Sequence, residues 1–336
     1  IFSKLLSISR GFYFGKRPEK DDKGFITDFK MGPEVPFLEY GKAMRQRFGG
    51  RIQKLAIDAG LSCPNRDGRV GFNGCTFCLN EAFSPSYCRE CNSLSIQLDK
   101  ALEFHLSRNR KADHYIAYLQ SGSYANASKL HRIYTEVLSH PAISGLIIGT
   151  RPDCISSEIL DVLEDLSRST YIAIEYGIES VYDTTLTHVN RGHSFQCAID
   201  AVAQSKARGL DVGGHFILGL PNESHNDIIA GIGKINTLGL DFIKFHQLQI
   251  YRGTAMEREF TEHPERFIFS SDYTSVDYIA LLCDVIRHLD PMIAIERLSS
   301  LAPMHLLHHS PLRGIRPDQL RGELIQKMQS LNAVQG

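Results

Sequence analysis

Six short apolar runs rich in β-branched residues recur along the chain, and each is followed by a stretch with helical periodicity. Strands that alternate with helices form βαβ units, and the strands of such units pair in parallel. Six units are fewer than the eight that close a full barrel. The sequence therefore predicts an α/β fold, an open, partial (β/α)6 barrel of the TIM type. The six runs lie at residues 54–59, 115–120, 145–149, 171–176, 212–218 and 242–248, and a candidate seventh lies at 292–297.

Helix-capping residues support this division. Asn126 precedes apolar residues at helical spacing and is expected to cap the helix that they form. Ser194 is expected to open a helix that ends at Gly209, because glycine is favoured just past a helix end. Ser224 and Asp227 have the spacing of a capping box.

Composition places the chain among ordinary globular proteins. It has 336 residues, of which 43% are hydrophobic and 22% charged, so a packed core is expected. The formal net charge of −1 gives no global attraction to polyanions. The chain has no apolar run of membrane-spanning length and no signal-peptide pattern, so we expect no membrane contact and a cytoplasmic location. We divide it into an N-terminal extension (1–40), the partial barrel (41–300) and a C-terminal helical tail (301–336).

Five of the eight cysteines crowd into residues 63–91, which indicates metal binding in a reducing compartment and not a disulfide framework. Cys63, Cys75 and Cys78 lie in the loop after the first predicted strand. Three thiolates are too few for a closed tetrahedral zinc site unless a fourth ligand is found. Three thiolates can hold a 4Fe–4S cluster by three of its irons and leave the fourth iron open to a small chelating molecule.

Six stretches along the chain form a recognisable set: KLAIDAGLSCPNRDG, GCTFC, GTRPD, NRGH, HFILGLPNES and KFHQLQIYRGT. Together they resemble the radical S-adenosylmethionine (SAM) superfamily. Within it the chain is most similar to the YhcC-like group, which is related to the radical-SAM domain of the elongator catalytic subunit. The resemblance covers roughly residues 40–300. The first cysteine gap has eleven residues in place of the common three, and this longer gap is shared with these branches.

The resemblance implies a reaction and its cofactors. SAM would chelate the open iron, and one electron from the reduced cluster would cleave it to give a 5′-deoxyadenosyl radical that abstracts hydrogen from an unknown substrate. An external one-electron reductant of the flavodoxin or ferredoxin kind is required. Kinship with the elongator subunit makes RNA a candidate partner.

The resemblance also points to five SAM-binding residues, while catalytic residues toward the substrate stay unassigned. Phe77 would pack beside the adenine, and Gln120 would replace the usual acidic residue near the SAM amino group. Arg151 would hold the methionine carboxylate, although an ion pair with Asp153 or Glu175 is the alternative. Glu175 points into the barrel, so we expect it to pair with a ligand ammonium, a ribose hydroxyl or Arg151. His215 is either a core residue or a contact to SAM or substrate.

Two alternatives stay open. Cys88 and Cys91 repeat the metal-ligand spacing and form an auxiliary site or remain free thiols. With Cys88 or Cys91 as a fourth ligand, the cysteine loop would bind zinc, and the chain would be a non-catalytic zinc- or cluster-binding module that binds nucleic acid or regulates a partner.

Overall fold

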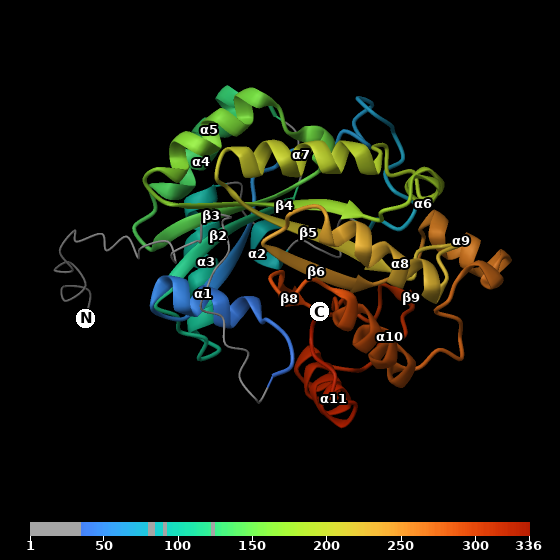
Figure 1. Cartoon of the computed structure of the whole chain (residues 1–336). Coiled ribbons are helices and arrows are strands. Elements are labelled where there is room, and N and C mark those ends of the chain that lie inside the picture. Colours follow the sequence, from blue (N-terminus) through green and yellow to red (C-terminus); the bar gives the residue numbers. More distant parts are fainter. Residues whose placement is uncertain (1–34, 80–84, 90–92, 122–124) are drawn as a thin grey trace.

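The computed structural model describes residues 35–79, 85–89, 93–121 and 125–336. Seven parallel strands form a curled sheet, an open half-barrel in the order β1-β2-β3-β4-β5-β6-β8 (Figure 1). The predicted α/β partial barrel is confirmed, and the candidate seventh run is a strand. The strands are β1 (Ile52–Asp58), β2 (His114–Ser121), β3 (Ile143–Thr150), β4 (Tyr171–Glu179), β5 (Asp211–Leu218), β6 (Phe242–Gln247) and β8 (Ala294–Arg297).

Helices cover the outer face of the sheet, and their predicted start signals are confirmed. The side chains of Asn126, Ser194 and Ser224 each accept a hydrogen bond from a backbone N–H of the first turn. Ser224 and Asp227 form a complete capping box. The long helices are α3 (Leu94–Leu106), α4 (Ala127–Leu138), α5 (Ser157–Ser167), α7 (Phe195–Ala207), α8 (His225–Asn236) and α10 (Ser275–His288), and the shorter ones are α1 (Tyr40–Phe48), α2 (Ser86–Arg89), α6 (Asp183–His188) and α9 (Ala255–Glu262).

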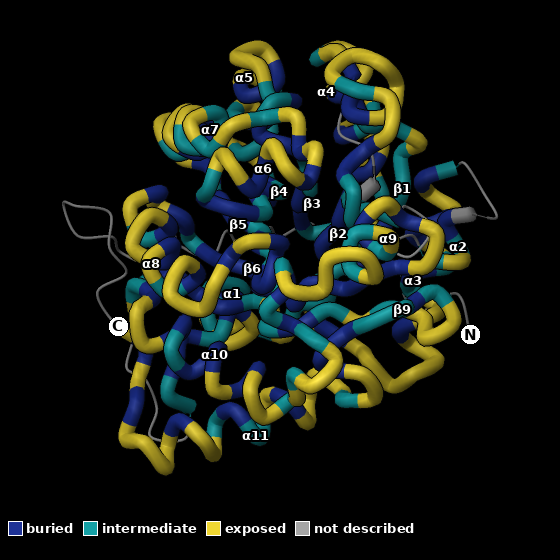
Figure 2. The backbone as a smooth tube through the Cα atoms, turned by 90° about the vertical axis from the view of Figure 1, so that its right-hand side faces the viewer, coloured by how far each residue is buried: buried dark blue, intermediate teal, exposed yellow. Residues whose placement is uncertain are grey.

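The strands are buried on both faces because the helices cover one side and the barrel interior fills the other. Ile147, Ala173 and Ile174 at the centre of the sheet are fully buried. Burial concentrates along the strands while exposed residues follow the outer sides of the helices (Figure 2). None of the described helices is long and apolar enough to cross a bilayer.

The segment after residue 300 is not purely helical. The short strand β9 (Leu307–His309) pairs antiparallel with β7 (Ile250–Tyr251), and α11 (Pro317–Ser330) packs against α10. The tail is therefore joined to the barrel by backbone pairing. Of the predicted N-terminal extension, residues 1–34 lie outside the described residues, and the domain division itself stays a prediction.

Four charged side chains form a closed ring inside the barrel. The Lys54 Nζ lies 2.7 Å from the Glu175 Oε1 and 2.6 Å from the Glu296 Oε2. The Lys244 Nζ binds the Glu175 Oε2 and lies 3.2 Å from the Glu296 Oε1. Lys54 belongs to β1 and Glu296 to β8, the two edge strands of the open sheet. The ring thus joins two edges that share no ladder of hydrogen bonds.

In the ring, each buried charge has partners of opposite sign, and without them its burial would be unfavourable. Glu175 is 0% exposed and Lys244 is 1% exposed, and an unpaired charge at such sites carries a large desolvation penalty. Burial by itself would raise the pKa of Glu175, but Lys244 and Lys54 outweigh burial and hold that pKa well below its usual range. Glu175 is therefore a carboxylate at neutral pH.

Removing one partner of the ring should destabilise the fold. We expect Lys244→Met to lower the free energy of unfolding by about 3–5 kcal/mol, because it leaves buried carboxylates with too few counter-charges. Urea unfolding of the cluster-free protein, followed by circular dichroism, measures this change. The matched control is Arg168→Met, which removes an exposed pair with Asp165 and should change stability little. Equal losses in the two variants would show that the ring does not stabilise the barrel.

Candidate functional site

A cavity of about 280 Å³ lies at the carboxyl ends of the strands, where the loops of an α/β barrel build active sites. Cys63, Cys75 and Cys78 all line it. The structure therefore brings the three predicted cluster ligands to one cavity. Phe77, Gln120 and His215, three of the five predicted SAM contacts, line the same cavity.

The cysteine loop is shaped by local backbone turns. The backbone N–H groups of Arg66 and Asp67 donate to the Cys63 carbonyl at 2.8 and 3.0 Å. Gly74 has a φ of 72°, and a Cβ there would lie 2.9 Å from the Arg66 side chain. A side chain at Gly74 would meet both strain and a clash, which explains the glycine directly before Cys75.

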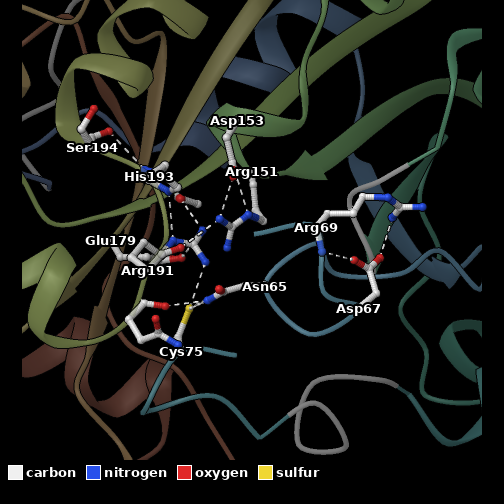
Figure 3. Close-up of polar contacts among 12 residues, drawn as sticks. Asn65, Asp67, Arg69, Cys75, Arg151, Asp153, Glu179, Arg191, His193 and Ser194 are labelled. Atoms are coloured by element: carbon white, nitrogen blue, oxygen red, sulfur yellow. Dashed lines mark hydrogen bonds and ion pairs between the residues drawn. The ribbon is translucent and has the colours of Figure 1, made fainter. Parts of the chain in front are cut away.

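A second segment, residues 189–193 after α6, is hydrogen-bonded to the cysteine loop. Figure 3 shows Arg191 of this segment next to Cys75 of the loop. The Thr76 backbone N–H donates to the Val189 carbonyl at 3.0 Å. The Asn190 side chain donates to the Gly74 carbonyl at 2.7 Å, and the Asn65 side chain donates to the Asn190 carbonyl at 2.5 Å. The predicted strand-loop motif is thus completed by residues more than 100 positions further along the chain.

Two side chains donate hydrogen bonds to a cysteine sulfur. The Arg191 Nη1 lies 3.5 Å and the Asn65 Nδ2 3.7 Å from the Cys75 Sγ. Arg191 is buried, and although burial disfavours its charge, Cys75 and Glu179 raise its pKa above the usual value. Hydrogen-bond donors of this kind support a metal-bound thiolate. Three cysteines around one cavity with such support fit a cluster that has three protein ligands.

The described residues contain no group of three His, Cys, Asp or Glu side chains close enough to hold a single metal ion. In a 4Fe–4S cluster each cysteine binds a different iron, so the ligands surround the cluster and do not meet at one point. Cys88 is buried away from this cavity, and its Sγ lies 3.7 Å from the Ala56 carbonyl oxygen. Cys91 lies outside the described residues, so the auxiliary site stays untested.

Arg151 does not line the cavity. Its guanidinium forms two 2.8 Å hydrogen bonds with Asp153, the alternative that the sequence left open, and its Nη2 donates to the Arg191 carbonyl at 2.9 Å. Arg66, Arg191 and Arg297 line it instead, and Arg191 is the one that faces Cys75. The sequence has one signal for Arg191, the NRGH stretch, and that stretch does not by itself indicate a role for the arginine.

Glu175 also lies below the cavity and not in its wall. Its partners are Lys54, Lys244 and His215, so the expected ion pair with Arg151 is wrong, while a contact of Glu175 with SAM stays a prediction. The Glu175 Oε2 lies 2.8 Å from the His215 Nε2. Burial and then Lys244 lower the pKa of His215, so the ring is neutral, and we assign its proton to Nε2 because Glu175 is an acceptor. His215 is therefore held in one orientation against the cavity.

Glu179, at the end of β4, adds a carboxylate to the cavity wall. Its φ is 74°, a left-handed conformation that is strained for a residue other than glycine. Its Oε1 lies 3.4 Å from the Arg191 Nη2. A guanidinium has five N–H donors. In Arg191, Nε donates to the His193 Nε2 at 3.1 Å, Nη1 to the Cys75 Sγ and Nη2 to the Gly177 carbonyl, so two donors remain for Glu179 or a ligand.

Comparison with known proteins agrees with this geometry. The radical SAM superfamily profile matches residues 67–232, and the radical SAM C-terminal domain profile matches residues 240–335. Bacillus subtilis YtqA is 30% identical over 300 residues, which are 87% of this chain and 89% of YtqA. Escherichia coli YhcC is 34% identical over 266 residues, which are 78% of this chain and 83% of YhcC.

More distant similarity reaches the elongator proteins. Mouse elongator complex protein 3 is 26% identical over 193 residues, which are 56% of this chain and 32% of that protein. The structure of the archaeal Methanocaldococcus infernus Elp3 superposes with a TM-score of 0.64 at 16% identity, over 84% of this chain and 64% of that one, and so shares the fold. The profiles and the YtqA and YhcC matches show the family: this chain belongs to the radical SAM superfamily, in the group that contains YhcC.

Proposed function

We propose that this protein is a radical SAM enzyme whose Cys63, Cys75 and Cys78 ligate a 4Fe–4S cluster and whose 280 Å³ cavity binds SAM. The observation that carries the proposal is the convergence of the three thiols, the Cys75-facing Arg191 and three predicted SAM contacts on one cavity. When bound, the cluster and SAM supply the one-electron cleavage and the hydrogen-abstracting radical typical of the superfamily.

The protein's own residues bind SAM and orient it in the cavity. We assign the methionine carboxylate of SAM to Arg191, because a guanidinium offers two parallel donors to a carboxylate. Arg151 acts through Arg191 by holding its backbone carbonyl. Phe77 offers an aromatic face for the adenine. Gln120 and His215 offer polar contacts from β2 and β5, and Glu175 fixes the His215 ring.

The reaction also needs partners outside this chain. We propose a one-electron donor of the flavodoxin or ferredoxin kind. RNA remains a proposed substrate class, supported by the relationship to elongator complex protein 3 over about half of the chain. A net charge of −1 gives no overall electrostatic attraction toward such a polyanion.

Cluster assembly and SAM cleavage test the proposal together. Protein reconstituted without oxygen should be brown and should contain about four irons and four sulfides per chain, as a 4Fe–4S cluster requires. With dithionite as the reductant, it should release 5′-deoxyadenosine from SAM. Cys75→Ala should lose the product completely, whereas Cys197→Ala, a free thiol away from the cavity, should retain it. A colourless zinc protein, or an intact cluster that never cleaves SAM under several reductants, would refute enzymatic function.

The assignment of Arg191 has its own test. Arg191→Met should weaken SAM binding to the cluster-loaded protein by about 10- to 150-fold, the effect of losing a charged hydrogen bond worth about 1.5–3 kcal/mol. Isothermal titration measures the affinity, and iron content confirms that the cluster is retained. Arg258→Met, an exposed arginine away from the cavity, is the control. Unchanged affinity in Arg191→Met would contradict the assignment.

A further inference from the structure

One wall of the cavity has no role in the function proposed above. It runs from the end of β6 to the segment after β8 and includes His246, Arg297 and Ser300. The cysteine loop and Arg191 lie on other elements. These three side chains are therefore free to recognise something other than the cluster and SAM.

Arg297 is exposed at this wall and brings a positive charge to it. Within the described part of the chain, its guanidinium makes no hydrogen bond or ion pair, whereas Arg66 donates to the Cys78 carbonyl at 2.9 Å and Arg191 is engaged as described above. The nearest acidic side chain in sequence, Glu296, is already bound by both lysines of the ring. No carboxylate of the ring is left over for Arg297.

His246 and Ser300 add an imidazole and a hydroxyl to this wall. Burial and then the charge of Arg297 lower the pKa of His246 well below its usual range, so its ring is neutral and carries one N–H. Neither the His246 ring nor the Ser300 hydroxyl has a hydrogen-bond partner among the described residues. The Ser300 backbone, by contrast, is fixed by Gln247, with bonds of 2.8 and 2.9 Å.

A second cavity of about 480 Å³ adjoins this wall and shares Arg297 and Ser300 with the first. Its lining is mixed, with the apolar Ile295 and Leu298 beside the carboxylates Glu39, Glu296 and Asp318. Its other arginine, Arg321, is paired with Glu39 at 2.6 Å. Small-molecule sites commonly have about 300–1,000 Å³. The first cavity alone, at about 280 Å³, is just below that range, so a substrate that binds beside SAM needs the second.

We infer that Arg297, His246 and Ser300 bind an anionic group of the substrate, a carboxylate or a phosphate, at the junction of the two cavities. A guanidinium with free donors binds either anion through two parallel hydrogen bonds, and an imidazole N–H and a hydroxyl complete the set. The remainder of that substrate extends into the second cavity. This inference rests on the proposed function for its biological meaning, because only a substrate needs a site beside SAM.

Arginine labelling with phenylglyoxal tests the site in the full-length protein, with and without a reconstituted cluster. Peptide mass spectrometry gives the labelling rate of each arginine, and inorganic phosphate and acetate are the probes. We expect Arg297 to be labelled and either probe to slow its labelling at least threefold. The probe that protects at the lower concentration identifies the anion class. His246→Gln should reduce the protection.

Two other arginines serve as internal controls. Arg258 is exposed and remote from both cavities, and Arg321 lines the second cavity but is already paired. Their labelling should not respond to either probe. Equal protection of Arg258 and Arg297, or no protection of Arg297, would overturn the inference. Failure of cluster assembly would instead overturn the proposed function and leave the labelling of Arg297 interpretable.

Discussion

The ring of Lys54, Glu175, Lys244 and Glu296 is the interaction on which the arrangement of this half-barrel depends. An open sheet has two edges, and the Lys54–Glu296 pair connects them across the interior. β1 leads into the cysteine loop and β8 ends at Arg297, so the ring fixes the distance between two opposite parts of the site. Such a ring is weak evidence for net stability, because desolvation offsets the attraction, but it fixes which strands face each other.

The ring also connects to the cavity through Glu175. This carboxylate accepts from two lysines and faces His215, so one buried anion orients a cavity residue. A comparable chain of contacts supports the cysteine loop from the other side, where Asp153 holds Arg151 and Arg151 holds the Arg191 carbonyl. Glu175 and Arg151, both predicted to contact SAM, do not line the cavity but hold His215 and Arg191, which do.

The sequence was sufficient to predict those features that depend on residues close together in the chain. Strand runs, the capping box at Ser224 and the spacing of the three cysteines each lie within a few residues or one loop, and the structure agrees with them. It was insufficient to predict ion pairs between residues far apart in the chain, because a charged residue in a strand does not reveal which other strand it faces. Lys244 is 69 residues from Glu175 and looked unremarkable in its run. The three-residue strand β9 is too short to have a readable alternation.

Charge is distributed unevenly around the cavity, and the two ligands that we propose for it fall on its two sides. On the side of β4 the Arg191 guanidinium is shared between Cys75, Glu179 and backbone, so it is already held in place before any ligand binds. The backbone strain at Glu179 is consistent with a side chain that must be placed there. On the side of β8, Arg297 has no such partner among the residues that the structure describes. A preorganised arginine suits an invariant cofactor, and an unpaired one suits a substrate that brings its own negative charge.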